Sequence, residues 1–361
     1  MAADLKERNS YQRLLFPLLS HMDAESAHDR TISALALAQD RAAGRSFLRR
    51  IAGALPQQPV KLFGLKFPNC LGVAAGFDKE VRAAEGLALL GFGHIEVGTI
   101  TPLPQAGNEK PRVFRLAEDE AIINRMGFPS AGMRPAREQL KALATADKRY
   151  IVGVSLGKQK ETPLTQAAED YIQVLRTVFP YADYVALNIS SPNTPELRKL
   201  QGEEYLSNLL GDLAAENKRQ ASELQVARRP LLVKIAPDLS RSELNTILQV
   251  AIDNEIDGII ATNTTTSRNS LSDKNRDQGG GLSGRPLSAQ SLEILSSITR
   301  ETGGQLPIIA AGGIFTADDV RARIDAGASL VQIYTALVYE GPGIAGRILR
   351  ELANSSAPLK V

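Results

Sequence analysis

The residues from Asn188 to Thr194 are the part of the chain best suited to carry chemistry. They read Asn-Ile-Ser-Ser-Pro-Asn-Thr and follow the β-rich run 183–187, so amide and hydroxyl side chains gather in a loop at a predicted strand end. Pro192 fixes its own φ and restricts the residue before it, which holds the loop in one shape. Such a loop is typical of a substrate-binding site, although the same composition also occurs in ordinary turns.

A second candidate is Lys234, which lies within the apolar pattern Val-Lys-Ile at 233–235. A buried ammonium group needs an anion or strong acceptors to offset the cost of leaving water. Lys234 is therefore predicted to face an interior partner. The alternative is a side chain that extends along a rim to solvent.

Two glycine-rich segments are candidates for binding phosphate. One is 279–284, which reads Gly-Gly-Gly-Leu-Ser-Gly before a predicted helix, and the other is Gly312-Gly313 at the end of a predicted strand. Bare backbone amides and a helix N-terminus can together hold an anion. One glycine run would indicate little, and the two together favour a phosphate site.

These residues are positioned by short apolar runs that alternate with helical patterns after about residue 70, which predicts repeated βα units. Eight units over roughly 290 residues match a (β/α)8 TIM barrel, whereas a doubly wound sheet usually stops at five or six strands. In a barrel the active site lies at the carboxyl ends of the strands. The predicted strands are 71–75, 94–98, 150–155, 184–189, 231–235, 258–262, 307–311 and 330–334.

The first 55 residues differ from the rest and predict an N-terminal helical hairpin at 1–55, followed by the barrel at 56–361. The second helix of the hairpin is predicted over 24–39, and an insertion at 101–126 predicts a hairpin over the barrel mouth. The basic run 41–50 indicates either a solvated face or contact with an anionic membrane. The first helix would present one apolar face, formed by Leu14, Leu15, Leu18 and Leu19.

Composition excludes several classes of protein. The 361 residues contain 42 Lys and Arg against 40 Asp and Glu, a net charge of +2 that does not indicate a nucleic-acid partner. A single cysteine, Cys70, excludes an intramolecular disulfide, and three histidines without ligand spacing predict no metal site. No apolar run is long enough to span a membrane, and the polar start does not predict a signal peptide, so we expect an intracellular protein.

The sequence resembles the dihydroorotate dehydrogenases, flavin enzymes of pyrimidine synthesis, from about residue 11 to 343. The resemblance implies FMN as cofactor and dihydroorotate and orotate as substrate and product. The motifs that carry it are 74–79, 124–128, 188–194, 261–265, 281–286 and 331–334. The implied flavin contacts are Ala75, Gly76, Lys79, Thr99, Ser155, Asn188, Lys234, Thr262, Gly284, Gly313, Tyr334 and Thr335. The implied substrate contacts are Lys79, Asn124, Arg125, Met126, Gly127, Phe128, Asn188, Asn193, Asn263 and Thr264.

The residue at the catalytic-base position divides this family. A soluble branch that uses fumarate or NAD has cysteine there, and a membrane-associated branch that uses quinone has serine; this chain has Ser191. The resemblance implies a proton relay through Thr194 and water near Phe128. It also implies a quinone tunnel at the N-terminal helices, peripheral association with the cytoplasmic face of the cell membrane, and a monomer. The tunnel positions are His28, Arg115 and Tyr334.

Four positions depart from the family pattern. Ser155, Gln159 and Pro129 stand where asparagine is commoner, and Glu196 stands where glycine is commoner, in a loop expected to cover the substrate.

Three other functions stay open. The alternatives are the fumarate or NAD branch, a metal-free lyase for sugar phosphates on the same barrel, and a non-catalytic binding barrel. Flavin absorbance, its bleaching by dihydroorotate and the reoxidising acceptor separate them.

Overall fold

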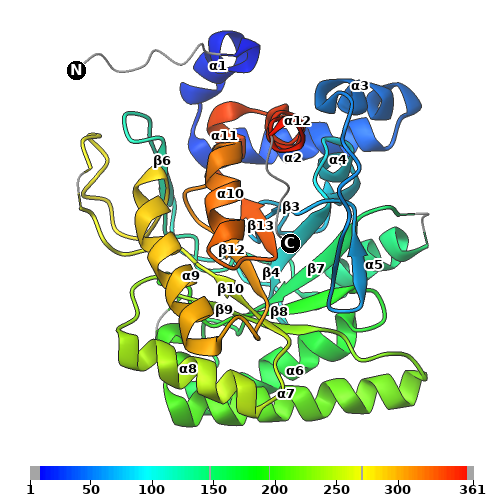
Figure 1. Ribbon diagram of the computed structural model, residues 1–361, viewed down its shortest axis with the longest axis vertical. Coiled ribbons are helices and arrows are strands. Elements are labelled where there is room, and N and C mark those ends of the chain that lie inside the picture. The colour runs from blue at the N-terminus through cyan, green and yellow to red at the C-terminus, as the bar shows by residue number, and fades with distance from the viewer. Residues whose placement is uncertain (1–8, 146–147, 195, 270, 356–361) are drawn as a thin grey trace.

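The computed structural model describes residues 9–145, 148–194, 196–269 and 271–355. Its centre is a closed barrel of eight parallel strands in the order β10-β12-β13-β3-β4-β7-β8-β9 (Figure 1). The predicted TIM barrel is confirmed, and each predicted strand is present with ends shifted by two residues at most. The barrel strands are β3 (Leu71–Val73), β4 (His94–Ile100), β7 (Ile151–Leu156), β8 (Tyr184–Asn188), β9 (Leu231–Ile235), β10 (Gly258–Ala261), β12 (Ile308–Ala311) and β13 (Leu330–Ile333).

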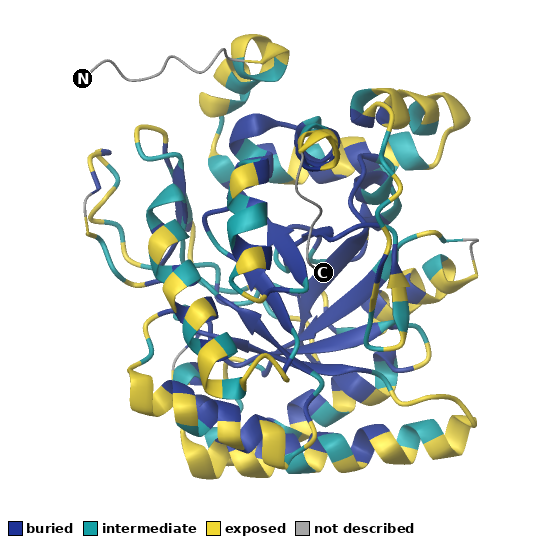
Figure 2. Cartoon of the chain, viewed as in Figure 1, coloured by how far each residue is buried: buried dark blue, intermediate teal, exposed yellow. Residues whose placement is uncertain are grey.

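The strands form because runs of valine, isoleucine and leucine can be buried on both faces of a parallel sheet. Figure 2 shows the barrel as the most deeply buried part of the chain, inside helices whose outer faces are exposed. The helices that follow the strands are α4 (Ala84–Leu89), α5 (Met133–Ala144), α6 (Ala167–Val178), α7 (Glu203–Leu224), α8 (Arg241–Asp253), α9 (Ser288–Thr302), α10 (Ala317–Asp325), α11 (Thr335–Glu340) and α12 (Ile344–Asn354). Short 3-10 turns are η2 (Leu164–Gln166), η3 (Leu197–Gln201) and η4 (Arg285–Leu287).

The insertion after β4 forms the predicted hairpin, from β5 (Val113–Leu116) and β6 (Ala121–Asn124). A third strand, β11 (Gly281–Gly284), pairs with β6, so the glycine run 279–284 is partly strand, and the run precedes η4 and the helix α9, as predicted. Glycine is required in β11 by close packing, because a Cβ at Gly281 would lie 2.0 Å from Thr264 Oγ1.

A second hairpin, β1 (Val60–Leu62) and β2 (Leu65–Phe67), lies between the N-terminal extension and the first barrel strand. The Phe67 ring packs edge-on against His94, at the start of β4, with 5.5 Å between ring centroids. The hairpin therefore covers the amino-terminal end of the barrel, opposite the end where the polar loops gather.

The N-terminal extension contains a π-helical turn η1 (Tyr11–Leu15), α1 (Phe16–Ser20), α2 (Ala24–Gln39) and α3 (Ala42–Ala52). The α2 helix has the predicted bounds, whereas α3, which carries the basic run, was not predicted as a helix. Buried side chains of α2 and α3, including Ile32, Leu35 and Leu48, join the main hydrophobic core. Among the described residues, no helix is both long and apolar enough to cross a membrane.

Candidate functional site

A cavity of about 500 Å³ extends from the carboxyl ends of the barrel strands to the helices of the N-terminal extension. Most of the residues predicted for the site border it. Three do not: Thr194, Ser155 and Arg125. The predicted residues that line the cavity are His28, Ala75, Gly76, Lys79, Thr99, Arg115, Asn124, Met126, Gly127, Phe128, Asn188, Ser191, Asn193, Lys234, Thr262, Asn263, Thr264, Gly284, Gly313, Tyr334 and Thr335.

Amide and hydroxyl side chains form a connected row across the strand ends. Asn188 Nδ2 donates to Thr99 Oγ1 at 3.0 Å, and Asn263 Nδ2 donates to Asn188 Oδ1 at 3.1 Å. Behind this row, the Ser155 hydroxyl lies 3.0 Å from Thr99 Oγ1. Ser155 is fully buried and acts on the cavity through Thr99, without reaching it directly.

The loop after β8 places Ser191 at the cavity wall. Ser191 Oγ accepts a hydrogen bond from the backbone N of Asn193 at 3.3 Å, and Asn193 Nδ2 donates to Asn124 Oδ1 at 3.1 Å. The hydroxyl of Thr194 is buried and has no hydrogen-bond partner among the residues that the structure describes. The loop therefore holds one serine facing the cavity, with an unused hydroxyl three residues further on.

Lys234 has the interior partner that the sequence required, and this partner is Glu96, in the middle of β4. Lys234 Nζ lies 3.6 Å from Glu96 Oε1, and the Glu96 side chain is 0 % exposed. The other carboxylate oxygen accepts hydrogen bonds from the Tyr184 hydroxyl at 3.1 Å and from Gln332 Nε2 at 2.9 Å. Burial, together with the charge of Glu96, raises the pKa of Tyr184 well above its usual value, so this hydroxyl stays a donor. Sequence reasoning missed Glu96, although a charge inside an apolar strand is the same signal that indicated Lys234.

Lys79 and His28 meet where the polar part of the cavity joins the N-terminal helices. Lys79 Nζ lies 3.5 Å from His28 Nε2, and the imidazole packs edge-on against Phe77 at 5.1 Å between centroids. Burial, and then the charge of Lys79, lowers the pKa of His28 to about 3. His28 is therefore a neutral imidazole at physiological pH, able to accept a hydrogen bond.

Two arginines that were predicted for the site, Arg115 and Arg125, make different contacts. Arg115 lines the cavity, and its Nη1 donates to the carbonyl oxygen of Met22 at 2.8 Å, which ties β5 to the segment before α2. Arg125 points away from the cavity, because its guanidinium donates to Gln278 Oε1 at 3.0 Å and stacks over Phe114 at 4.6 Å. The backbone of Arg125 is engaged as well, since its N donates to Arg112 O at 2.8 Å and its carbonyl accepts from Asn108 Nδ2 at 3.0 Å, so the expected substrate contact of Arg125 is not supported.

Glycines from both of the runs singled out in the sequence line the cavity. Gly313 has a φ of +69°, and a Cβ there would lie 2.4 Å from Ser288 Cα at the first turn of α9. The hydroxyls of Ser283 and Thr335 lie 2.8 Å apart beside Gly284. A phosphate group could be held here by backbone amides, by two hydroxyls and by the start of a helix, because the glycines place no side chain in between.

One departure from the family pattern has a structural cost. Glu196 has a left-handed backbone, with φ of +58°, which explains why glycine is commoner there. Its exposed carboxylate pairs with Lys199 one turn on. Cys70 is buried, and burial raises the pKa of its thiol to about 11, so it is not a reactive thiolate.

The sequence profile described as dihydroorotate dehydrogenase matches residues 58–355. The chain belongs to the dihydroorotate dehydrogenase family. A relative named dihydroorotate dehydrogenase (quinone) from Arthrobacter sp. (strain FB24) is 48% identical over 358 residues, covering 96% of this chain and 98% of the relative. A relative of the same name from Acidithiobacillus ferrooxidans is 47% identical over 94% of this chain and 93% of the relative.

Solved structures of the family share the whole architecture. The dihydroorotate dehydrogenase of Eimeria tenella in complex with ferulenol has a TM-score of 0.83 and 38% identity, covering 94% of this chain and 95% of that one. The ligand-free form from the same organism has a TM-score of 0.79 and 40% identity, covering 88% and 94%. The similarity to the ferulenol complex extends beyond the 58–355 profile match into the N-terminal extension.

Proposed function

We propose that the protein oxidises dihydroorotate to orotate with FMN as hydride acceptor and a quinone as terminal acceptor, in the synthesis of pyrimidines. The observation that carries the proposal is the convergence of three features on one cavity. These are the Ser191 loop, the buried Lys234 and the glycine cradle, in a chain close to half identical to relatives named for the quinone-dependent reaction.

The residues present fit FMN. The cradle of Gly284, Gly313 and Thr335 suits a terminal phosphate, and the row of Thr99 and Asn188 supplies donors and acceptors for the polar edge of a flavin ring. Lys234 supplies positive charge where the reduced ring carries negative charge. Bound there, FMN would supply a two-electron acceptor for the hydride of dihydroorotate. The remaining flavin contacts that we propose are Ala75, Gly76, Lys79, Thr262 and Tyr334, with Ser155 acting through Thr99.

Ser191 is the proposed base that removes the proton from C5 of dihydroorotate. A serine hydroxyl is a weak base at neutral pH, so it needs a group that accepts its own proton. Its Oγ accepts from Asn193 N, which leaves the hydroxyl hydrogen free to leave. The buried hydroxyl of Thr194, which has no partner among the described residues, supports a relay through that residue, and Phe128 lines the cavity wall.

The substrate would lie between Lys79 and the amide side chains. Lys79 suits a carboxylate, while Asn124 and Asn193, already bonded to each other, suit the amide edge of the substrate ring. Asn263 and Thr264 face them from the end of β10. The proposed backbone contacts are Met126, Gly127 and Phe128, whereas Arg125 lies outside the cavity lining.

We assign the quinone to the outer part of the cavity, between η1, α1, α2 and α3. Its walls there are apolar and include Leu15, Phe16, Leu19, Phe47 and Ile51. His28, Arg115 and Tyr334 lie at the inner end of this passage and would contact the quinone head group.

The same helices are proposed to bind the membrane, so that residues 1–55 form the membrane- and quinone-binding unit and 56–361 the catalytic barrel. Leu14 and Leu18 are 69% and 68% exposed, although both are large and apolar. Exposed leucines in η1 and α1, together with the arginines of α3 in the same N-terminal extension, suit an anionic lipid surface. We therefore propose a monomer that associates peripherally with the cytoplasmic face of the cell membrane.

The deciding experiment mixes the purified protein anaerobically with dihydroorotate and then adds an acceptor. We expect flavin absorbance that is bleached by dihydroorotate and restored rapidly by a soluble quinone, and slowly by fumarate or NAD. Faster recovery with fumarate or NAD would assign the chain to the other branch. A colourless protein would favour the sugar-phosphate lyase, and a yellow protein that dihydroorotate does not bleach would favour the binding barrel.

A further inference from the structure

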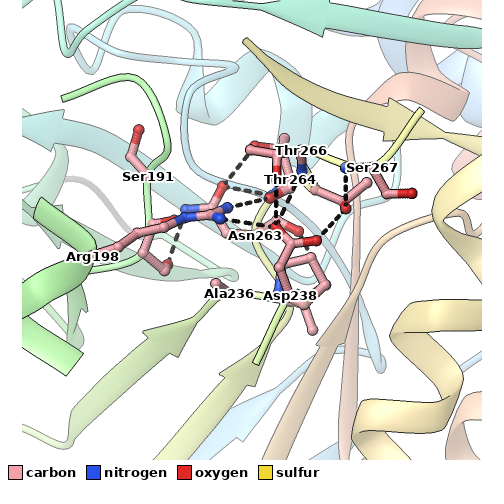
Figure 3. A network of polar contacts seen from close by, with 12 residues as sticks. Ser191, Arg198, Ala236, Asp238, Asn263, Thr264, Thr266 and Ser267 are labelled. Atoms are coloured by element: carbon pink, nitrogen blue, oxygen red, sulfur yellow. Dashed lines mark hydrogen bonds and ion pairs between the residues drawn. The ribbon is translucent and has the colours of Figure 1, made fainter. Parts of the chain in front are cut away.

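An ion pair outside the cavity joins loops at the mouth of the barrel. Arg198, in η3 after β8, donates from Nη1 to Asp238 Oδ2, in the loop after β9, at 2.8 Å. Figure 3 shows Arg198 reaching toward Asp238 and the 264–266 segment, with Ser191 on the same segment after β8 as Arg198. Neither member of the pair lines the cavity.

The guanidinium of Arg198 also binds two backbone carbonyls. Its Nε donates to Ser190 O at 3.1 Å, and its Nη2 donates to Thr264 O at 3.0 Å. One rigid, planar group therefore bonds the loops that follow β8, β9 and β10. A lysine could not do this, because its single ammonium lacks the fixed fork of donors.

Asp238 completes the network on the other side. Its carboxylate accepts from the hydroxyl of Thr265, from the backbone N of Thr266 at 3.1 Å, and from Gln290 Nε2 at 3.2 Å. Burial by itself would raise the pKa of Asp238, but the hydrogen bonds from Thr265, Thr266 and Arg198 outweigh it and lower that pKa. The carboxylate is therefore ionised at neutral pH and holds Arg198 through a charge-assisted bond.

These bonds act on the peptide units next to the proposed machinery. The carbonyl of Ser190 and the nitrogen of Ser191 belong to one planar peptide, so fixing the first orients the backbone that carries the second. Thr264 O belongs to the loop of Asn263, whose Nδ2 donates to Ser190 Oγ at 3.0 Å. The geometry points to Arg198 and Asp238 as a positioning pair. The pair fixes the position of the base Ser191 relative to the side-chain amide of Asn263, which is proposed to bind the substrate. This assignment rests on the proposed function.

A pair that only stabilised the barrel would behave differently, and the chain offers a matched control. Arg228 and Asp257 form a bidentate pair at the opposite end of the barrel, before β9 and β10, with N to O distances of 2.7 and 2.8 Å. Asp257 also accepts from the backbone N of Leu231 at 2.8 Å. Arg228→Gln therefore breaks a comparable ion pair far from the mouth.

The test compares Arg198→Lys, Arg198→Gln and Arg228→Gln in the FMN-loaded protein. We expect both Arg198 variants to keep their FMN but to lose flavin reduction by saturating dihydroorotate on the order of 10²-fold, the loss expected from a misplacement of about 1 Å. Arg228→Gln should reduce at the wild-type rate within about twofold. Amide hydrogen exchange over 188–194 should be faster in both Arg198 variants and unchanged in Arg228→Gln.

Reduction of Arg198→Lys at the wild-type rate would overturn the positioning role, and so would equal losses in Arg198→Gln and Arg228→Gln. If Arg198→Gln does not fold, Arg198→Lys decides, because it keeps the charge and the aliphatic stem. A wild-type flavin that dihydroorotate does not reduce is a failure of the proposed function. Hydrogen exchange then still decides whether the pair holds the loop, since unchanged exchange in Arg198→Lys contradicts it.

Discussion

Replacing Lys234 with methionine tests the buried charge pair of the barrel. The substitution keeps the length and apolar stem of the side chain but removes the ammonium that lies 3.6 Å from Glu96 Oε1. The carboxylate of Glu96 is 0 % exposed, so the substitution leaves it in the barrel interior without a charged partner. Its two remaining hydrogen bonds, from Tyr184 and Gln332, do not neutralise its charge.

The structure sets the size of the effect. Two unit charges 3.6 Å apart attract by about 4 to 5 kcal/mol at an effective dielectric constant of about 20. Removing one member of a buried pair typically costs about 3 to 5 kcal/mol, because the other charge is left without compensation. We therefore expect the free energy of unfolding of Lys234→Met to fall by about 3 to 5 kcal/mol.

Urea unfolding followed by circular dichroism gives this energy, and repeating it at two FMN concentrations separates fold stability from flavin affinity. The matched control is the double variant Lys234→Met with Glu96→Gln, which removes both charges and should recover most of the stability but not the flavin affinity. The reasoning is refuted by a loss below about 1 kcal/mol in Lys234→Met, or by a double variant as unstable as the single one.

Three further predictions concern the base, the N-terminal anchor and the membrane. Ser191→Ala should keep its FMN but lose flavin reduction by about 10² to 10⁴-fold in anaerobic stopped flow, and near-normal reduction would exclude Ser191 as the base. The buried Arg112 donates to the Glu25 carboxylate from Nη2 at 2.7 Å and from Nε at 3.0 Å. Burial by itself would raise the pKa of Glu25, but these bonds lower it below 4.5. Glu25→Gln should therefore cost about 3 kcal/mol at neutral pH, and the difference from wild type should disappear as the pH falls below 4.5 through the lower folded pKa; a difference that persists at low pH would contradict this. Leu14→Ser with Leu18→Ser should weaken binding to anionic vesicles more than about tenfold and spare flavin reduction, while Leu224→Ser, an exposed leucine of α7, should change neither; equal effects would remove the membrane assignment.

The sequence alone was sufficient for the barrel, and most of the residues that it proposed for the site line one cavity. The strands could be predicted because each is a short apolar run that must be buried on both faces. The loop from Asn188 to Thr194 could be placed at a strand end because its polar residues directly follow such a run. Lys234 required an interior partner for the same physical reason, since a charge within an apolar strand cannot be left unpaired.

Tertiary structure decided what these residues meet. Glu96 and Lys234 lie on β4 and β9, which are not neighbours in the barrel, so they face each other across its interior only after the barrel closes. Arg198 and Asp238 are both charged residues in loops, and their sequence resembles that of any solvated surface. The α3 helix was missed because its arginines suggested a surface run, while its few buried residues pack against other parts of the chain. Local sequence determines which residues must be buried, but the closure of the barrel determines which distant charge, carbonyl or helix each of them contacts.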